Sequence, residues 1–487
     1  MLKSIPSKTL SRRWDHRLNV ESKSRTGSTL KSNAVTQSQN KTIALGTAKP
    51  TAEAFPWTSV VFNALMPSSH KKLNTEGQEE SSLRADKYGG AFKLGEALNY
   101  CHSAGAPQLV HFLTRHIEQF HNPPYEDWEC TLTCGNTSAL DMVFRTFCNR
   151  GDYVLCEENT YSGTIEALRP LGINIQAIKM DKHGLMPEDL ERVLDTWDLS
   201  HGPKPFLLYM VPTGHNPTGI TQPAERRKAI YAVAEKHDLY IVEDDPYYLL
   251  PLGPYENSTG TKSSRISFPR LDEILRTLPP SYLSMDISGR VLRLDSTSKI
   301  LGPGLRCGWM TASAQIARLM VAHNEVSVVA PSGMSQIMVY KLLSEAWDYE
   351  GFSLWLGTLS SQYRIRRDAL LAGCEQYLPV DICSWEIPEF GMLFFLTIDW
   401  HKHPRAQANP DHGSGDNIRA ILTIEEAIFK RAAADGVAVA KGSWFRADRN
   451  SAETLTFRLT FAAAPRMDLV EGIRRFGDAI KVEFGLT

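Results

Sequence analysis

The sequence predicts an α/β protein in which helices cover both faces of a mostly parallel sheet, followed by a smaller α+β domain. Strand and helix patterns alternate from residue 128 to residue 299, and the pattern changes after residue 345. Polar side chains follow directly after five predicted strands, at 135–137, 161, 216, 245–248 and 296–299. Ligands of such sheets bind beyond the carboxyl ends of the strands, so the five groups predict one binding site.

The composition is that of an ordinary globular protein. The chain has 487 residues, enough for two or more packed domains, with 42% hydrophobic and 22% charged residues. The formal net charge of −2 gives no indication of binding to nucleic acid or to a membrane surface. No apolar run approaches the roughly 18 residues of a membrane-spanning helix.

The eight cysteines predict neither a zinc site nor a disulfide framework. They include no CxxC pair, and Cys130 and Cys134 lie four residues apart without histidine partners. This pattern favours a reducing compartment, and we expect the cytoplasm. The first forty residues are rich in Ser, Thr, Lys and Arg, which also suits a mitochondrial transit peptide. Asp15-His16 and Glu21 interrupt that composition.

Residues 1–85 show little periodicity and are interpreted as an N-terminal arm. Residues 43–46 have the pattern of a short strand or of the entry to a loop, and Phe55-Pro56-Trp57 marks a turn. Apolar residues between 93 and 120 predict helices on either side of Gly105-Ala106-Pro107.

Residues 86–345 are predicted to form the large domain. Short apolar runs predict strands at 128–133, 153–156, 173–178, 206–211, 239–242 and 291–294. Helices are predicted at 139–148, 187–197 and 224–237, with one more after Thr160-Tyr161-Ser162-Gly163. A polar insertion occupies roughly 252–280.

Residues 346–487 are predicted to form the smaller domain. The expected elements are a helix at 358–378, a strand at 390–398, a Pro/Gly/His-rich loop at 401–417, a helix at 424–435 and a strand at 454–461.

The polar turn that ends in Lys299 has the composition of a site for a phosphorylated aldehyde. It follows the buried strand at 291–294, and a lysine amine can form a Schiff base. Ser296, Ser298 and Arg306 supply hydroxyls and a planar guanidinium suited to a phosphate dianion. Gly302-Pro-Gly304 resembles a dinucleotide loop only weakly, because that motif directly follows a strand and opens a helix.

Three residues after the neighbouring strands suit a flat heterocycle. Asp245 follows a buried strand, where a carboxylate needs a partner such as a protonated pyridine nitrogen. Asn216 and Tyr248 can donate hydrogen bonds to an oxygen on the same ring. A helix cap for Asp245 and a turn before proline for Asn216 are the alternative interpretations.

Further candidates surround the same predicted site. Asn136 and Thr137 open a helix, where backbone N–H groups and the helix dipole favour a phosphate, although plain capping needs the same residues. Tyr161 can stack on a flat ring. Arg458, in an apolar strand, needs an anionic partner, either a substrate carboxylate or a surface acid.

With these residues in place, the chain resembles the class I aminotransferases, pyridoxal-phosphate enzymes of fold type I. It is most similar to the subgroup of aromatic amino acid and 2-aminoadipate (kynurenine) aminotransferases, from roughly residue 10 to the C-terminus. The motifs are Asn216-Pro-Thr-Gly219, Glu243-Asp-Asp-Pro-Tyr-Tyr248 and Asp295-Ser-Thr-Ser-Lys299 with Gly304-Leu-Arg306. The resemblance implies a seven-stranded sheet and ping-pong transfer of an amino group from such an L-amino acid to a 2-oxo acid, first of all 2-oxoglutarate.

The resemblance also implies roles around the cofactor ring. Lys299 forms the Schiff base and then moves the substrate proton, and Asp245 pairs with the pyridine nitrogen. Asn216 and Tyr248 bind the ring oxygen, and Tyr161 stacks on the ring.

For the phosphate and the substrate, the resemblance implies a second set of contacts. Ser296, Ser298, Arg306 and the turn at Asn136-Thr137 bind the phosphate, and Arg458 binds the substrate α-carboxylate. Tyr100 matches the tyrosine that reaches the neighbouring subunit's phosphate site, which implies a homodimer with shared active sites. The stretch from Asp15 to Lys31 resembles a segment that folds over the substrate.

The sequence departs from the family pattern before Pro50. Gly46-Thr47-Ala48-Lys49 stands where a double glycine is usual, and Ala48 is expected to narrow the substrate pocket. Asn136-Thr137 replaces Ser-Gln, and Lys441-Gly442 replaces Pro-Gly. A lyase or decarboxylase on the same scaffold shares these motifs. A transcription regulator would need an N-terminal helix-turn-helix, for which residues 1–85 show no pattern.

Overall fold

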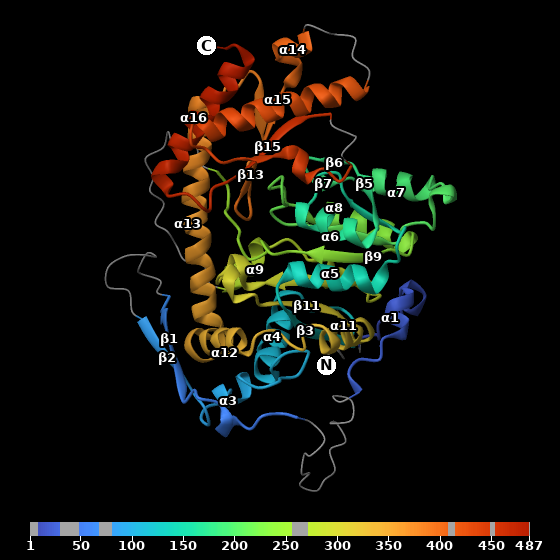
Figure 1. Ribbon diagram of the computed structural model, residues 1–487, viewed down its shortest axis with the longest axis vertical. Coiled ribbons are helices and arrows are strands. Elements are labelled where there is room, and N and C mark those ends of the chain that lie inside the picture. The colour runs from blue at the N-terminus through green and yellow to red at the C-terminus, as the bar shows by residue number, and fades with distance from the viewer. Residues whose placement is uncertain are drawn as a thin grey trace, which may run out of the picture.

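The computed structural model describes residues 8–29, 48–67, 80–255, 271–407, 414–448 and 453–486. The predicted strand at 43–46, Thr47, and parts of the stretches 252–280 and 401–417 lie outside these ranges. Figure 1 shows a large sheet with its helices in the lower part of the molecule and a smaller sheet at the top. The long helix α13 (Asp348–Tyr377) runs along both parts.

The large sheet has seven strands, as the resemblance implied. Their order is β3-β11-β10-β9-β8-β4-β5, and all pairs are parallel except the two made by β11. The strands are β3 (Trp128–Thr133), β4 (Tyr153–Glu157), β5 (Asn174–Ile178), β8 (Leu207–Met210), β9 (Tyr240–Asp244), β10 (Val291–Ser296) and β11 (Gly308–Ser313). Every residue of β8, β9, β10 and β11 is buried, as expected for strands of a sheet that helices cover on both faces.

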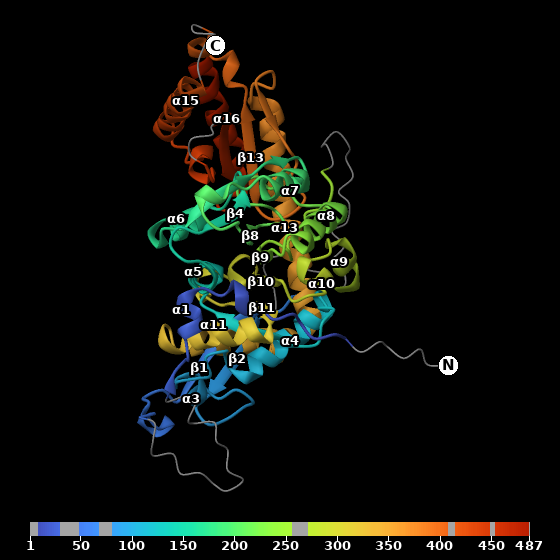
Figure 2. The same cartoon turned by 90° about the vertical axis from the view of Figure 1, so that its right-hand side faces the viewer.

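Helices cover both faces of this sheet, as Figure 2 shows. One face carries α5 (Asn136–Phe147), α6 (Ser162–Leu171) and α11 (Ala314–Val326). The other carries α4 (Pro107–Phe120), α8 (Ala224–Lys236) and α10 (Tyr282–Met285). Shorter or flanking helices are α3 (Leu94–Ala97), α7 (Pro187–Asp195), α9 (Leu271–Thr277) and α12 (Gly333–Tyr340).

The upper part contains a second, four-stranded sheet in the order β12-β13-β15-β14. Its strands are β12 (Cys383–Trp385), β13 (Leu393–Ile398), β14 (Ala440–Lys441) and β15 (Leu455–Thr460). The helices α14 (Pro404–Gln407), α15 (Ser414–Ala434) and α16 (Arg466–Phe484) accompany it. The strand expectations match β13 and β15, whereas α16 was not predicted.

The N-terminal arm has more structure than its sequence suggested. The strands β1 (Ser59–Leu65) and β2 (Glu80–Asp86) form an antiparallel hairpin. Further toward the N-terminus, the short helix α1 (Val20–Ser24) follows Trp14, whose side chain is fully buried. The Trp14 ring lies 5.1 Å from that of Tyr240, and Arg290 lies 5.2 Å above it.

These contacts show where residues near Asp15 lie in this chain, and the fold of the stretch from Asp15 to Lys31 over the substrate stays a prediction. Tyr240 is the first residue of β9, and Arg290 directly precedes β10. Trp14 therefore packs at the amino ends of the parallel strands, opposite the end where ligands bind.

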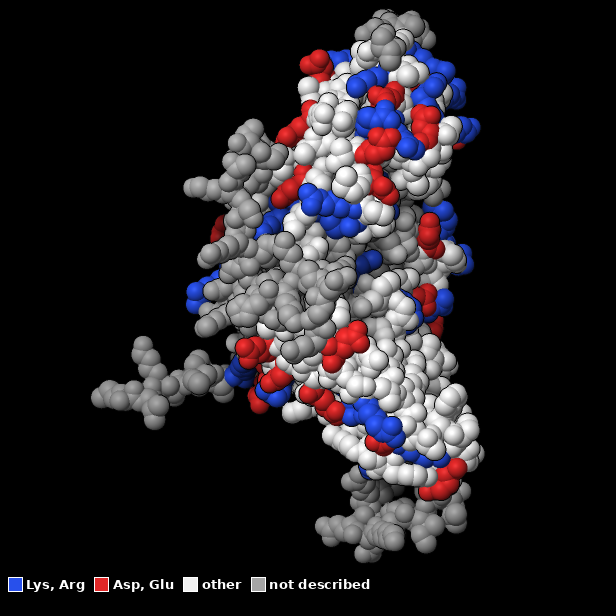
Figure 3. Space-filling model, turned by 90° about the vertical axis from the view of Figure 1, so that its left-hand side faces the viewer, with Lys and Arg blue, Asp and Glu red and all other residues white. Residues whose placement is uncertain are grey.

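The surface carries no strong charge bias on the face drawn in Figure 3, where basic and acidic side chains are interspersed. None of the described helices is long and apolar enough to cross a membrane.

Candidate active site

A cavity of about 260 Å³ opens at the carboxyl ends of the parallel strands. Eight residues predicted from the sequence line it: Asn136, Thr137, Tyr161, Asn216, Ser296, Ser298, Lys299 and Arg306. They come from the ends of four strands, β3, β4, β8 and β10, and the sheet brings them together as expected.

Lys299 ends a 3-10 turn (Thr297–Lys299) that directly follows β10. Its side chain is half-buried, with Nζ 5.9 Å from the ring centroid of Tyr247. Within the described residues it makes no hydrogen bond or ion pair. Burial lowers the pKa of Lys299, the positive charges of Arg458 and Arg306 lower it further, and Asp244 opposes them. The amine is therefore more readily neutral than an exposed lysine.

The structure contradicts the placement of Asp245 and Tyr248 at this cavity; Asp244 and Tyr247 line it instead. The strand β9 continues to Asp244, two residues beyond the predicted end, and successive side chains of a strand point to opposite faces. Asp245 is 1% exposed and binds Thr213 and Arg293 on the other face. Tyr248 donates a hydrogen bond to the carbonyl of Pro279.

Asp244 is a buried carboxylate held by neutral donors. Asn136 Nδ2 lies 2.7 Å from one of its oxygens, and the Tyr209 hydroxyl lies 3.0 Å from the other. Among the described residues it has no ion-pair partner. Burial raises its pKa to about 6, against the two hydrogen bonds, which lower it. The carboxylate is thus placed to receive a cationic group in the cavity.

The first turn of α5 lies beside this carboxylate. Gly135 precedes the helix with φ +86°, and no side chain caps the first N–H groups. The Asn136 side chain is engaged with Asp244, so its backbone N–H is the group left for an anion. Uncapped N–H groups at the start of a helix of this length attract an anion.

Hydroxyls and a guanidinium complete the anion-binding side. Ser296 Oγ and Ser298 Oγ lie 2.8 Å apart, and both line the cavity. Arg306 is exposed and donates to the carbonyl of Cys134 over 2.8 Å. Gly135 has φ +86°, a conformation that favours glycine, and a Cβ there would also lie 2.5 Å from the Arg306 guanidinium.

Arg458, on β15 of the smaller sheet, meets the cavity through Asn216. Its Nη1 donates to Asn216 Oδ1 over 2.9 Å, and its guanidinium lies 4.5 Å from the ring centroid of Phe445. Burial lowers its pKa, and it has no carboxylate partner among the described residues. A half-buried arginine of this kind is suited to bind a ligand carboxylate.

Tyr161 precedes α6 and lines the cavity. A Cβ on Gly163 would lie 2.5 Å from the Tyr161 ring, so the ring rests where only a glycine leaves space. The neighbouring Thr160 donates its N–H to the carbonyl of Phe445 over 2.7 Å, which ties this loop to the upper part of the molecule.

Two predicted residues lie away from the cavity in this chain. Tyr100 is 61% exposed and does not line the cavity. Ala48 is also exposed and also absent from the lining. The two segments lie side by side, because the Asn99 side chain donates to the carbonyl of Pro50 over 2.7 Å.

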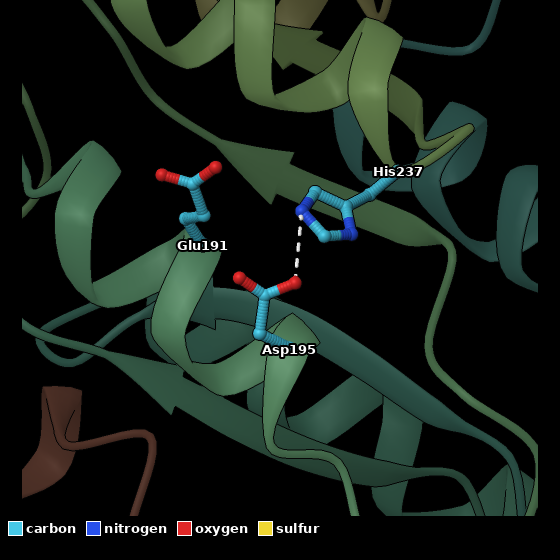
Figure 4. A group of neighbouring side chains, drawn as sticks. All are labelled: Glu191, Asp195 and His237. Atoms are coloured by element: carbon cyan, nitrogen blue, oxygen red, sulfur yellow. Dashed lines mark ion pairs between the residues drawn. The ribbon is translucent and has the colours of Figure 1, made fainter.

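Outside the cavity, one group of potential metal ligands occurs in the described ranges. Glu191, Asp195 and His237 converge between α7 and the end of α8 (Figure 4). Lys236 already pairs with Glu191 at 2.5 Å, and Lys204 Nζ lies 3.0 Å from His237 Nδ1. The two ammonium groups supply the positive charge that a metal ion would bring.

The donors around the cavity fit pyridoxal phosphate. A phosphate matches the α5 turn, the two serines and Arg306, and a protonated pyridine nitrogen matches Asp244. The free amine of Lys299 matches the aldehyde. The fold and the site together define a fold type I pyridoxal-phosphate enzyme.

Comparison with known proteins agrees. Residues 75–476 match the family model of aminotransferase class I and II, and the chain belongs to this family. It is 45% identical to the aminotransferase swnA of Arthroderma benhamiae over 99% of this chain and 94% of the relative. It is 37% identical to an aromatic amino acid aminotransferase of Schizosaccharomyces pombe over 96% and 98% of the two chains.

A solved structure extends this similarity to three dimensions. The aminotransferase Aro8 from Candida albicans superimposes with a TM-score of 0.90 at 35% identity, covering 98% of this chain and 100% of the other. The protein is thus an aminotransferase with pyridoxal phosphate as its cofactor.

Proposed function

We propose that this aminotransferase moves the amino group of an aromatic or 2-aminoadipate-like L-amino acid to 2-oxoglutarate. The observation that carries the proposal is a single cavity lined by the Lys299 amine, the buried carboxylate of Asp244 and the Asn216 side chain. Among the described residues neither Lys299 nor Asp244 has an ion-pair partner. Asn216 accepts a hydrogen bond from Arg458, whose guanidinium has no carboxylate partner in the same ranges. Relatives named as aromatic amino acid, L-tyrosine:2-oxoglutarate, and kynurenine/alpha-aminoadipate aminotransferases support these substrates.

We assign the cofactor contacts from the geometry. Asp244 holds the pyridine nitrogen, and Asn136 and Tyr209 fix the orientation of the Asp244 carboxylate. Tyr247 and Asn216 take the ring oxygen, and Tyr161 lies against the ring. The first turn of α5 with Ser296, Ser298 and Arg306 holds the phosphate. When bound, the cofactor supplies an electron-withdrawing ring that stabilises the charge left at the substrate Cα.

Lys299 moves the proton in this scheme. With the cofactor bound, the neutral Nζ of Lys299 would take the proton from the substrate Cα as a base and would later give it back as an acid. A base must be neutral to accept a proton, and burial together with Arg458 and Arg306 lowers the pKa of Lys299 accordingly. The same amine then serves the return half-reaction with the 2-oxo acid, which predicts ping-pong kinetics.

Arg458 binds the substrate α-carboxylate. Its second nitrogen remains available, because the only hydrogen bond that it makes among the described residues goes from Nη1 to Asn216. A bidentate contact orients the Cα–H bond of the substrate relative to Lys299.

We further propose a homodimer in which Tyr100 reaches the phosphate site of the second subunit. Its ring is largely exposed, although the neighbouring Asn99 side chain fixes its loop to the carbonyl of Pro50. Ala48 lies in the same exposed region and would then face the second subunit's substrate. Analytical ultracentrifugation should give a dimer, and Tyr100→Phe should lower cofactor affinity without changing the mass.

The cytoplasm is the proposed location. All eight cysteines are free, which fits a reducing compartment. Fluorescent fusions at either terminus should both give diffuse cytoplasmic signal, and a mitochondrial pattern would contradict the proposal.

The direct test is a panel of amino donors with 2-oxoglutarate. Glutamate should form with aromatic donors or with 2-aminoadipate, and Lys299→Ala should lose both turnover and the near-visible band of the bound cofactor. Lys228→Ala, on the exposed side of α8, is the matched control and should retain both. Release of ammonia or CO₂ without glutamate would show a lyase or a decarboxylase instead.

A further inference from the structure

We propose that Trp355 is a positioning residue for Lys299, an inference that rests on the proposed role of Lys299. Trp355 lies on α13, far along the chain from the lysine. Its indole Nε1 donates a hydrogen bond to the main-chain carbonyl of Ile300 over 2.6 Å. Trp355 therefore holds the residue that directly follows Lys299.

The turn that carries Lys299 is held by few backbone groups. The N–H groups of Ile300, Leu301 and Gly302 all point to one acceptor, the carbonyl of Thr297, at 3.2, 2.8 and 3.1 Å. The carbonyls at the end of such a turn have no partner within it. Ile300 is 4% exposed, so water has little access to its carbonyl, and the indole N–H supplies the missing partner.

The indole of Trp355 is itself held by a second tryptophan. The rings of Trp347 and Trp355 lie 5.3 Å apart with an interplanar angle of 31°. Trp347 Nε1 donates to the carbonyl of Leu65, on the hairpin strand β1, over 2.9 Å. Trp347 is buried. Through these contacts the two tryptophans connect strand β1 of the hairpin to the turn at Lys299. Both are on the helical segment that continues into the upper part of the molecule in Figure 1.

This support matters because Lys299 Nζ makes no hydrogen bond or ion pair of its own within the described part of the chain. The direction of its side chain is then set by its backbone, and by the peptide on either side. Ser296 caps the turn from the N-terminal side through the N–H of Ser298. Trp355 does so from the C-terminal side.

The test compares Trp355→Phe with Trp347→Phe. Both changes keep an aromatic ring and remove one indole N–H, but only the first removes a contact to the turn. Hydrogen–deuterium exchange is measured on the protein without added cofactor, followed by mass spectrometry of the peptide covering 297–305. We expect exchange about tenfold faster in Trp355→Phe, because the opening of the turn becomes easier. Trp347→Phe should leave this peptide unchanged.

The second readout is the pH titration of the near-visible band in the cofactor-loaded protein. A looser turn admits water to the lysine, so the midpoint should shift in Trp355→Phe and remain in place in Trp347→Phe. The loss of turnover should fall on kcat more than on KM, since the substrate carboxylate contact at Arg458 is untouched.

Wild-type exchange and an unchanged midpoint in Trp355→Phe would overturn the proposal, as would equal changes in both variants. If Trp355→Phe does not fold by circular dichroism, Trp355→Tyr takes its place in the same comparison. The exchange measurement needs no bound cofactor. A protein that forms no near-visible band would therefore refute the proposed function while leaving the role of Trp355 testable.

Discussion

The two faces of the large sheet differ sharply at the ends of β9 and β10. On the cavity face stand Asp244 and Ser296, which reach the ligand site. On the other face stand Glu243 and Arg293, fully buried and 2.9 Å apart. Residues that are adjacent in sequence thus belong to two environments, because a strand alternates its side chains.

The far face is an ionic network without space for a ligand. Arg293 binds Asp295 at 2.8 Å and Asp245 at 3.1 Å, and its guanidinium lies 4.4 Å from the centroid of the Tyr248 ring. Each carboxylate of this network has a fixed cationic partner. A buried ion pair of this kind serves the structure and contributes little net stability, although breaking it is costly.

The cavity face has the opposite arrangement. Asp244 is as buried as its neighbours, yet within the described ranges only neutral groups hold it, and burial raises its pKa to about 6. Asp245 and Asp244 are adjacent and both buried, but within the described ranges Asp245 is paired with a cation and Asp244 is not. This difference in counter-charge, and not burial or sequence position, marks Asp244 as the candidate functional carboxylate.

The largest expected effect separates Asp244 from Asp245. Asp244→Asn should lower kcat by about a hundred- to a thousandfold, because a carboxylate that stabilises the ring cation is lost. Asp245→Asn should remain active, since Arg293 keeps Asp295 and Glu243 as partners. Steady-state kinetics and the cofactor spectrum of both variants measure this. A larger loss in Asp245→Asn would reverse the assignment of the two faces.

Arg293→Met tests the ion-pair network on the face of the sheet away from the cavity. It leaves three buried carboxylates without their shared cation, and a broken buried pair typically costs about 3–5 kcal/mol of unfolding free energy. Arg226→Met is the control, because its partner Asp181 is partly exposed. Chemical denaturation of the two variants gives the difference. Equal stabilities would show that the far-face network does not hold the strand ends.

Asp244 should also make stability depend on pH when no cofactor is bound. A carboxyl pKa raised in the folded state means that the folded protein keeps a proton between about pH 4 and pH 6 that the unfolded chain releases. The free energy of unfolding then falls as pH rises through this window, by about 3 kcal/mol for a shift of two units. Denaturation of cofactor-free Asp244→Asn should lack this fall. Parallel curves for both proteins would show that burial in the empty cavity does not raise the pKa of Asp244.

Much of the fold was predictable because its strands are buried on both faces and its helices are amphipathic. The exceptions have physical causes. The strand β11 was not predicted, and it follows a glycine-rich stretch that gives no strand pattern. The hairpin β1–β2 has mixed polar residues, and its two strands pair across a long separation in sequence. Periodicity within a short window cannot indicate such pairing.

The site was predictable to the level of strand ends and no further. Each of the eight residues found at the cavity follows a strand whose apolar run is clear in the sequence. The sequence placed Asp245 rather than Asp244 at the cavity because Glu243, Asp244 and Asp245 are all acidic, so their order does not show which face each serves. The predicted strand also ended at Val242, which concealed the alternation that separates Asp244 from its neighbours.

The smallest expected effect distinguishes the adjacent tyrosines. Tyr247 lines the cavity beside Lys299, and loss of its hydroxyl in Tyr247→Phe should lower kcat about tenfold and shift the cofactor band, as one hydrogen bond to the ring oxygen is lost. Tyr248→Phe loses only the bond to the Pro279 carbonyl, so it should cost about 1 kcal/mol of unfolding free energy and leave kcat unchanged. Band position, kcat and denaturation midpoints are measured for both variants. A shift of the cofactor band in Tyr248→Phe without a shift in Tyr247→Phe would contradict the assignment. It would show that Tyr248, and not Tyr247, contacts the cofactor ring, because the band responds to groups that touch the ring.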